Sequence, residues 1–264
     1  MELIKILFIG DMFGKPGRQA VRNFLPQVLE EYPADLVLAN GENAAGGKGL
    51  TVDVYREIME LGIHFLTSGN HIWDKKEFLK DGANCPNFIR PLNYSALQPG
   101  AGYQVLDTPR GPVAVVNLAG RVFMGQANDP FEAIDTVLPA LQARSKVIFV
   151  DIHAETTSEK ACMAWHLDGR ASALVGTHTH VQTADERILP GGLGFITDVG
   201  MTGPRDSIIG AKIENALFSM RSGLKKSMDP AEGPLQFNAC YFVINADTAK
   251  TERVERICRI QTLS

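Results

Sequence analysis

The chain has 264 residues, of which 45% are hydrophobic and 21% are charged, so it can bury a sizeable core in one large domain or two small ones. A net charge of −4 argues against an extended nucleic-acid-binding surface, although a compact positive site is compatible with it. No apolar run reaches the roughly 18 residues of a membrane span, and the four cysteines form no Cys-x-x-Cys pair. We therefore expect reduced thiols, no membrane partner and a cytoplasmic location.

Short apolar runs and amphipathic segments alternate over the first 70 residues. The apolar runs predict strands over residues 4–9, 35–39 and 64–68, and helical spacing predicts a helix over 17–32 that Pro26 interrupts. Thr51 is in position to cap a further helix that ends near Leu61. Strands that alternate with helices in this way predict a parallel α/β core.

Beyond residue 100 the pattern changes. Hairpins are predicted for 102–106 with 112–118 and for 238–245 with 253–260, helices for 130–143 and 158–167, and strands for 146–151 and 173–175. No internal repeat, low-complexity tract or linker divides the sequence. We therefore expect an α/β fold in a single domain over residues 1–264, with either one mixed sheet or two packed sheets.

Polar side chains follow the predicted strands at the point where each strand ends. His178 and His180 follow the strand at 173–175, and because residues i and i+2 of an extended segment share a face, both imidazoles can reach one small volume. The carboxyl ends of parallel strands are where open α/β sheets place ligand sites. The other residues at these ends are Asp11, Glu42, Asn43, Asn70, His71 and His153. Their convergence from several strands favours one polar site more strongly than any single motif does.

Each of these residues also has a structural interpretation when it is taken alone. Asp11 can cap the helix that follows it, and Glu42 with Asn43 can form a turn before the glycines. His64 and His166 are not placed at strand ends in this way, so we interpret both as structural.

The set of side chains suits two metal ions rather than one. Two carboxylates, two amides and three imidazoles exceed the four ligands of a tetrahedral zinc, and they suit divalent ions such as manganese, iron or zinc. Two such ions bring +4, while the carboxylates of Asp11 and Glu42 with one bridging hydroxide bring −3, so a charge of +1 remains to attract a phosphate. A metal-bound hydroxide is a ready nucleophile near neutral pH. His71 is not needed as a ligand, and it is the natural general acid for the leaving oxygen.

In chain order, these residues resemble the signature of the calcineurin-like metallophosphoesterases. The matching segments are Gly10-Asp11, Gly69-Asn70-His71, His153 and Gly176-Thr177-His178-Thr179-His180. Three positions depart from the usual pattern: Phe13 replaces a histidine, Glu42 replaces an aspartate, and Ile72 replaces the acid that often follows Asn-His. These departures, with the segments 151–160 and 196–203, are similar to the YmdB-like subfamily of bacterial phosphodiesterases over nearly the whole chain.

The resemblance implies a fold, a site and an activity. The implied fold is an α/β/β/α sandwich of four layers with mixed sheets. One ion would be held by Asp11, Asn43 and His180, the other by Asn70, His153 and His178, with Glu42 bridging them and His71 as the acid. Family members hydrolyse phosphodiesters, with 2′,3′-cyclic nucleotides such as 2′,3′-cAMP as the favoured substrate, and they tend to form homo-oligomers. Iron or manganese is the expected metal, with zinc as the alternative.

Two other functions remain open at this point. A metal-dependent amidohydrolase usually carries His-x-His at its first strand, whereas here the pair lies at 178–180, and turnover of amides would distinguish it. A metal-loaded nucleotide-sensing or RNA-linked regulatory protein would bind the cyclic nucleotide without consuming it. Lys48, in its glycine-rich loop, is either a contact to the substrate phosphate or a solvated loop lysine.

Overall fold

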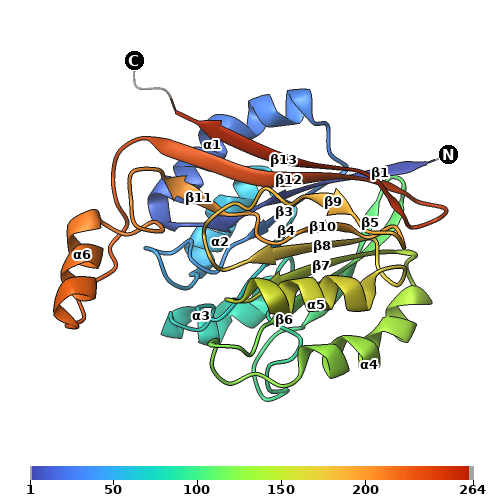
Figure 1. Cartoon of the computed structure of the whole chain (residues 1–264), viewed down its shortest axis with the longest axis horizontal. Coiled ribbons are helices and arrows are strands. Elements are labelled where there is room, and N and C mark those ends of the chain that lie inside the picture. The colour runs from blue at the N-terminus through green and yellow to red at the C-terminus, as the bar shows by residue number, and fades with distance from the viewer. Residues whose placement is uncertain (1, 262–264) are drawn as a thin grey trace.

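The computed structural model describes residues 2–261, which form two β-sheets that pack face to face between outer helices (Figure 1). The strands of the first sheet are β1 (Leu3–Ile9), β2 (Asp11–Met12), β3 (Leu36–Asn40), β4 (Phe65–Thr67), β11 (Met201–Pro204), β12 (Leu235–Asn245) and β13 (Thr251–Ile260). The strands of the second sheet are β5 (Tyr103–Thr108), β6 (Gly111–Ala119), β7 (Val147–His153), β8 (Ala173–Thr177), β9 (Arg187–Ile188) and β10 (Gly194–Ile196).

Each sheet combines parallel central strands with antiparallel neighbours. The first has the order β2-β11-β12-β1-β3-β4, with β13 paired to β12, and its strands β1, β3 and β4 run parallel. The second has the order β5-β6-β7-β8-β10-β9, and its strands β6, β7, β8 and β10 run parallel. Both faces of these strands are covered, so their sequences are largely continuous apolar runs. In β7, for example, every residue is buried.

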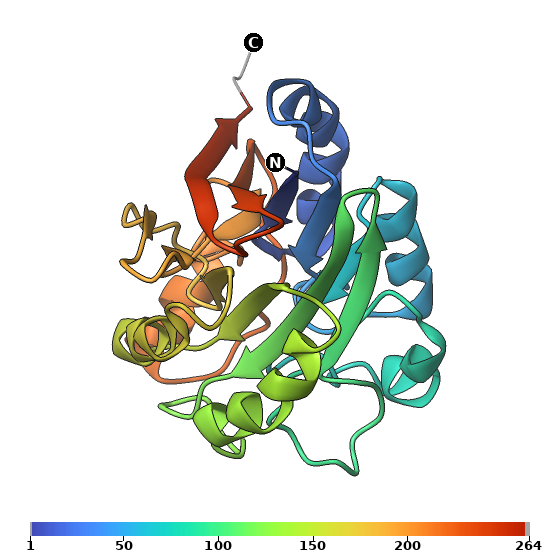
Figure 2. The same ribbon diagram turned by 90° about the vertical axis from the view of Figure 1, so that its right-hand side faces the viewer.

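Helices cover the outer face of each sheet (Figure 2). The helices are α1 (Gly14–Glu31), α2 (Val52–Glu60), α3 (Lys76–Asp81), the 3₁₀ helix η1 (Gly82–Asn84), α4 (Pro130–Gln142), α5 (Thr157–Leu167) and α6 (Ile213–Ser222). Helix α6 projects away from the body, at the left of Figure 1. Within the described residues, no helix is long and apolar enough to cross a membrane.

The core consists of three apolar clusters, one on the outer face of each sheet and one between the two sheets. One packs α1 and α2 on the first sheet, and another packs α4 and α5 on the second. The third lies between the sheets, where the ring of Phe8 stacks on that of Phe149 with centroids 5.6 Å apart. This order of layers confirms the predicted α/β/β/α sandwich.

The structure corrects several sequence predictions. Helix α1 begins at Gly14, three residues before the predicted start, and it continues through Pro26 to Glu31. Its N-cap is Phe13, with no side-chain capping bond, so Asp11 does not cap this helix. The predicted cap of α2 by Thr51 is confirmed, since its side chain accepts a hydrogen bond from Val54 N.

Short or unusually exposed elements were not predicted at all. Strands β2, β9, β10 and β11 have two to four residues, too few to show a period of two. Helix α6 carries Leu217, Phe218 and Met220 exposed on its surface, so its apolar residues do not mark a face buried against the body.

Candidate metal centre

The carboxyl ends of five parallel strands from both sheets meet at one edge of the sandwich. In the first sheet, Asp11 comes two residues after the end of β1, Glu42 and Asn43 follow β3, and Asn70 and His71 follow β4. In the second sheet, His153 is the last residue of β7, and His178 and His180 follow β8. The predicted residues therefore come from separate strands, and their contacts decide whether they form one site.

His153 is at the centre of the cluster. Its Nε2 lies 3.0 Å from Glu42 Oε1, 3.0 Å from Asn70 Oδ1 and 3.0 Å from His178 Nδ1. Gly69 makes room for this ring, because a Cβ at that position would lie 2.2 Å from His153 Cδ2. Potential ligand atoms from the ends of four strands thus meet around one point.

The remaining predicted ligands lie beside this point, and Asn43 connects them to Glu42. His178 N donates to Asp11 Oδ2 at 3.0 Å. Asn43 Nδ2 donates to Glu42 Oε1 at 3.0 Å and lies 3.3 Å from His180 Nε2. Glu42 therefore contacts both groups of side chains, which is the placement that a bridging carboxylate requires.

Unpaired polar atoms in the cluster indicate that it fits metal ions. Asp11 Oδ1 and Asn43 Oδ1 are buried and have no hydrogen-bond partner among the described residues. His180 Nδ1 lies 2.7 Å from the carbonyl oxygen of Ile209, which can only accept, so Nδ1 carries the proton and Nε2 presents a lone pair. Carboxylate oxygens, amide oxygens and imidazole nitrogens that meet in one buried place, with Asp11 Oδ1 and Asn43 Oδ1 unpaired, are a suitable ligand set for divalent ions.

A buried hydrogen-bond chain orients His153. Thr177 Oγ1 donates to Asp151 Oδ1 at 2.8 Å and accepts from His153 Nδ1 at 2.9 Å. Burial raises the pKa of the Asp151 carboxyl to about 7. Because His153 Nδ1 is engaged here, Nε2 points into the cluster, as is usual for a metal-binding histidine with an outer partner.

The electrostatics of the cluster favour positive charge. Burial alone would lower the pKa of His153, but the carboxylates of Glu42 and Asp11 raise it above its usual range. Burial alone would raise the pKa of Glu42, but the charge and hydrogen bond of His153 hold it below its usual range. Burial raises the pKa of Asp11, and burial together with the charge on His153 lowers the pKa of His178 to about 3. The carboxylates thus stabilise a cation at the point where the ligand atoms converge.

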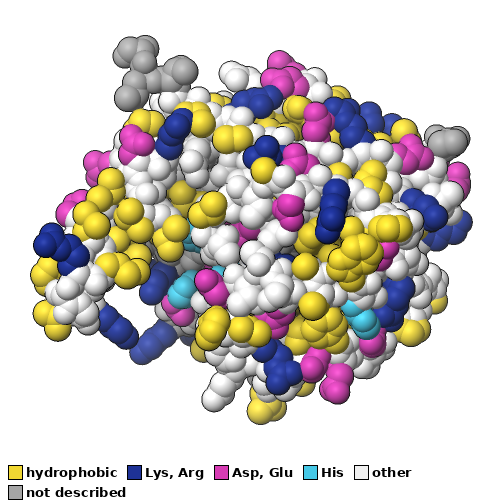
Figure 3. All heavy atoms as spheres, viewed as in Figure 1, with side chains coloured by type: hydrophobic (Ala, Val, Ile, Leu, Met, Phe, Trp, Pro, Cys, Tyr) yellow, Lys and Arg dark blue, Asp and Glu magenta, His cyan; other side chains and the backbone are white. Residues whose placement is uncertain are grey.

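A cavity of about 330 Å³ opens onto the cluster and is lined by His71, Lys48 and Met228 among others. In the space-filling view, histidine side chains lie at the edge of the hollow beside α6 (Figure 3). His71 N donates to Glu42 Oε2 at 2.9 Å, and His71 Nδ1 lies 2.9 Å from Asp74 Oδ2. His71 Nε2 is therefore the ring nitrogen that remains for a substrate.

The pairing of His71 with Asp74 gives a first testable prediction. We expect Asp74→Asn to lower turnover by up to about fivefold with metal content unchanged, because an exposed ion pair contributes ~0.2–1 kcal/mol. Steady-state kinetics and elemental analysis measure the two quantities. Asp53→Asn is the matched control, since Asp53 also pairs with a residue three positions away, Arg56, but on α2. Equal losses of turnover in the two variants, or loss of metal from Asp74→Asn, would contradict the view that Asp74 orients the ring of His71.

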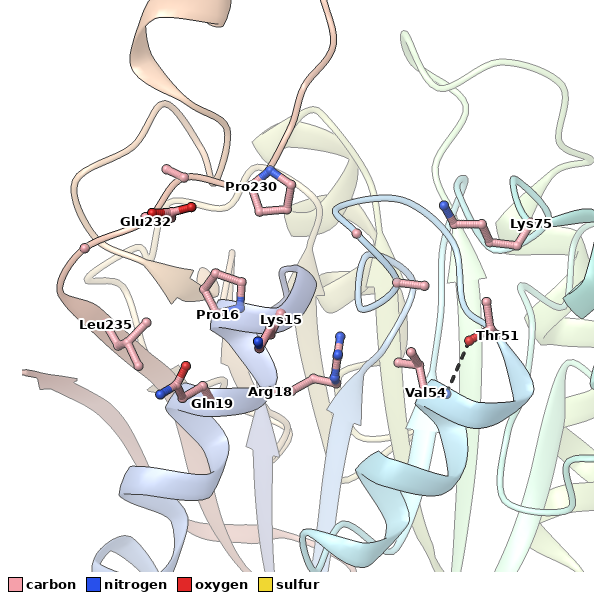
Figure 4. A pocket seen from close by; sticks show the side chains of 14 residues that line it. Lys15, Pro16, Arg18, Gln19, Thr51, Val54, Lys75, Pro230, Glu232 and Leu235 are labelled. Atoms are coloured by element: carbon pink, nitrogen blue, oxygen red, sulfur yellow. Dashed lines mark hydrogen bonds between the residues drawn. The ribbon is translucent and has the colours of Figure 1, made fainter.

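A larger cavity, of about 740 Å³, lies next to this one (Figure 4). Lys15, Arg18 and Lys75 line it, and none of the predicted metal ligands does. Gly46 lines the larger cavity while Gly47 lines the smaller one, so the glycine-rich loop separates the two. The candidate centre is therefore the smaller cavity, where the ligand atoms are.

Sequence reasoning missed the side chains that support the predicted ligands. Asp74, which lies two positions after Ile72, pairs with the ring of His71. Asp151 had a detectable signal, because it is a charged residue within an apolar strand and shares a face with His153. Glu155 Oε2 lies 3.1 Å from His178 Nε2, and nothing in its sequence neighbourhood marked this contact.

The two histidines interpreted as structural lie outside the cluster. His64 Nδ1 accepts a hydrogen bond from Val37 N at 2.9 Å. His166 Nε2 lies 2.9 Å from Asp135 Oδ1 and contacts Arg170 on the same surface. Both have protein partners, and no contact joins either of them to the predicted metal ligands.

Known proteins resemble this chain over almost its whole length. The family model of YmdB-like proteins matches residues 7–257. A Bacillus subtilis (strain 168) protein named 2′,3′-cyclic-nucleotide 2′-phosphodiesterase is 44% identical over 254 residues, which cover 96% of this chain and 96% of that protein. The crystal structure of a hypothetical protein from Thermus thermophilus has a TM-score of 0.92 at 40% identity and covers 98% of this chain and 100% of that one. The crystal structure of a novel phosphatase from Mycoplasma pneumoniae has a TM-score of 0.93 at 35% identity, covering 98% and 94% of the two chains. These matches show that the chain belongs to the family of YmdB-like proteins.

Proposed function

We propose that this protein is a dinuclear metal-dependent phosphodiesterase that hydrolyses 2′,3′-cyclic nucleotides such as 2′,3′-cAMP. The observation that carries the proposal is the contact of His153 Nε2 with Glu42, Asn70 and His178, beside a cavity lined by His71. The name of the Bacillus subtilis relative supports the choice of substrate.

The seven predicted ligands would form two groups of three that share Glu42. Asp11, Asn43 and His180 would hold one divalent ion, Asn70, His153 and His178 would hold the other, and Glu42 would contact both. We propose iron or manganese as the metal, with zinc as the alternative, because the mixed oxygen and imidazole donors suit these ions. When bound, the ions supply a nucleophile near neutral pH and stabilise negative charge on the phosphoryl group.

His71 would deliver the proton that the leaving oxygen needs. Its backbone is fixed by Glu42 Oε2 and its ring by Asp74 Oδ2, so Nε2 can be aimed at a substrate held in the cavity. Because Glu42 contacts both His71 and the ligand cluster, it couples the position of the acid to that of the ions.

Lys48 is the candidate contact to the substrate phosphate, since it lines the same cavity from the glycine-rich loop. We expect Lys48→Ala to raise KM by roughly 3- to 10-fold with metals retained, because hydrogen bonds to charged groups contribute ~1.5–3 kcal/mol and solvent weakens exposed ones. Lys15→Ala is the matched control, because Lys15 lines only the larger cavity. Unchanged KM in Lys48→Ala would show that the lysine is solvated and does not bind substrate.

Three further properties belong to the proposal. The two sheets share one apolar cluster, which supports a single metallophosphoesterase domain over residues 1–264. The exposed apolar side chains of α6 support a homo-oligomer, and the four free cysteines support a cytoplasmic location.

Turnover tests the proposed activity. Protein loaded with manganese or iron should convert 2′,3′-cAMP to a monophosphate over many cycles per chain. Saturable binding of 2′,3′-cAMP without product, in protein with a full complement of metal, would contradict the enzymatic function and favour a sensor.

A further inference from the structure

The turn that carries His178 and His180 has an unusual backbone. The angle φ is 106° at His178 and 66° at His180, in the left-handed region that residues with a Cβ rarely adopt. Ile209, whose carbonyl oxygen accepts from His180 Nδ1, also has a positive φ, of 46°. Such conformations raise the free energy of the chain and persist only where surrounding contacts hold them. The contacts that hold this turn therefore help to aim its two imidazoles.

Thr179, between the two histidines, is held by one buried carboxylate. Asp198 Oδ2 accepts from Thr179 N at 3.0 Å and from Thr179 Oγ1 at 2.8 Å. Asp198 Oδ1 accepts from Gly200 N at 2.8 Å, so both carboxylate oxygens are fixed. The main chain and the side chain of Thr179 are thus tied to the same acceptor.

Lys160 is the ion-pair partner of this carboxylate. Its Nζ lies 2.7 Å from Asp198 Oδ2, and both side chains are 0% exposed. The lysine extends from α5, which packs beside β7 and β8 (Figure 1), and passes Gly176, where a Cβ would lie 2.7 Å from Lys160 Cδ. A buried ion pair adds little net stability over an apolar pair of similar shape, so stability alone does not account for this one.

We propose that Lys160, Asp198 and Thr179 form a turn clamp that presets His178 and His180 for metal binding. The ammonium group holds the Asp198 carboxylate in place, the carboxylate accepts from both donors of Thr179, and Thr179 holds the backbone of the turn. Thr179 is a positioning residue, since it acts through the histidines on either side of it. The proposal rests on the metal-binding part of the proposed function.

Conservative substitutions of Thr179 test the turn clamp without burying a lone charge. Thr179→Val keeps the shape of the side chain and removes its hydroxyl donor, whereas Thr179→Ser retains the donor. Thr251→Val is the matched control, because Thr251 is also buried, with 4% of it exposed, and its Oγ1 donates at 2.7 Å to Ser172 O. Ser172 directly precedes β8, whereas His178 directly follows that strand. Manganese affinity is measured on the full chain by titration against a competing chelator, and Tm is measured by calorimetry.

We expect Thr179→Val to bind manganese roughly 10- to 100-fold more weakly, as loss of an outer partner of a metal ligand typically does. Thr179→Ser should bind manganese as the wild type does, and Thr251→Val should lower Tm with manganese affinity unchanged. Wild-type affinity in Thr179→Val, or equal losses in the valine and serine variants, would overturn the turn clamp. An equal loss in Thr251→Val would also overturn it, because general destabilisation would then explain the effect.

Two further results separate the parts of the proposal. A folded Lys160→Met protein should also bind manganese more weakly, and wild-type affinity in that variant would remove the lysine from the turn clamp. If the wild type itself binds no manganese, iron or zinc, the proposed function and the turn clamp both fail, whereas wild-type affinity in Thr179→Val alone overturns only the turn clamp.

Discussion

Replacing Glu42 with glutamine is expected to lower turnover by about 10³-fold or more and to reduce the metal content of the protein. Metal ions contribute several kcal/mol to the stabilisation of transition-state charge, and ~4 kcal/mol corresponds to about 10³ in rate. Glu42 is fully buried and contacts His153, Asn43 and the backbone of His71. Glutamine preserves the size of the side chain but loses the charge that attracts two cations, so both measurements should change together.

Elemental analysis and steady-state kinetics on the same preparation test this expectation. Glu57→Gln is the matched control, because Glu57 pairs with Arg18 and Arg22 on the helices and lies outside the ligand cluster. A Glu42→Gln protein with full metal content and full hydrolysis would rule out a bridging role for this carboxylate.

Replacing His71 with alanine is expected to give a different pattern, in which the metals stay and the rate falls by about 10²- to 10⁴-fold, the usual contribution of a general acid. The loss should be largest for substrates with poor leaving groups, because a good leaving group departs without a proton. His71 contacts Glu42 only through its backbone N, which alanine retains. The ligand cluster should therefore remain intact.

A series of phosphodiesters with nitrophenyl and alkyl leaving groups measures this dependence. An acid role predicts a small loss for nitrophenyl esters and a large loss for alkyl esters in His71→Ala. Equal losses across the series would argue that His71 binds substrate instead of protonating the leaving oxygen.

The positions of the predicted ligands could be read from the sequence because strand direction determines where they lie. Apolar runs identified β1, β3, β4, β7 and β8, and parallel strands bring their carboxyl ends to one edge. The residue after each of these strands therefore reaches the same region without any knowledge of loop structure. The four-layer order followed from the family resemblance, and the pattern of strands and helices was compatible with it.

The supporting contacts could not be predicted because they join residues that are distant in the sequence. The pair of Lys160 with Asp198 spans 38 positions and links a helix to a loop. The left-handed backbone at His178 and His180 also has no sequence signal, because such conformations usually select glycine or asparagine. Tertiary contacts decide both features.

Metal stoichiometry is the most direct test of the account. Elemental analysis of protein purified without chelator or added metal should find about two transition-metal ions per chain, as expected if both groups of ligands around Glu42 are filled. A value near zero that incubation with manganese or iron does not restore would mean that the strand-end cluster is not a metal site. The proposed phosphodiesterase activity would then have no chemical basis.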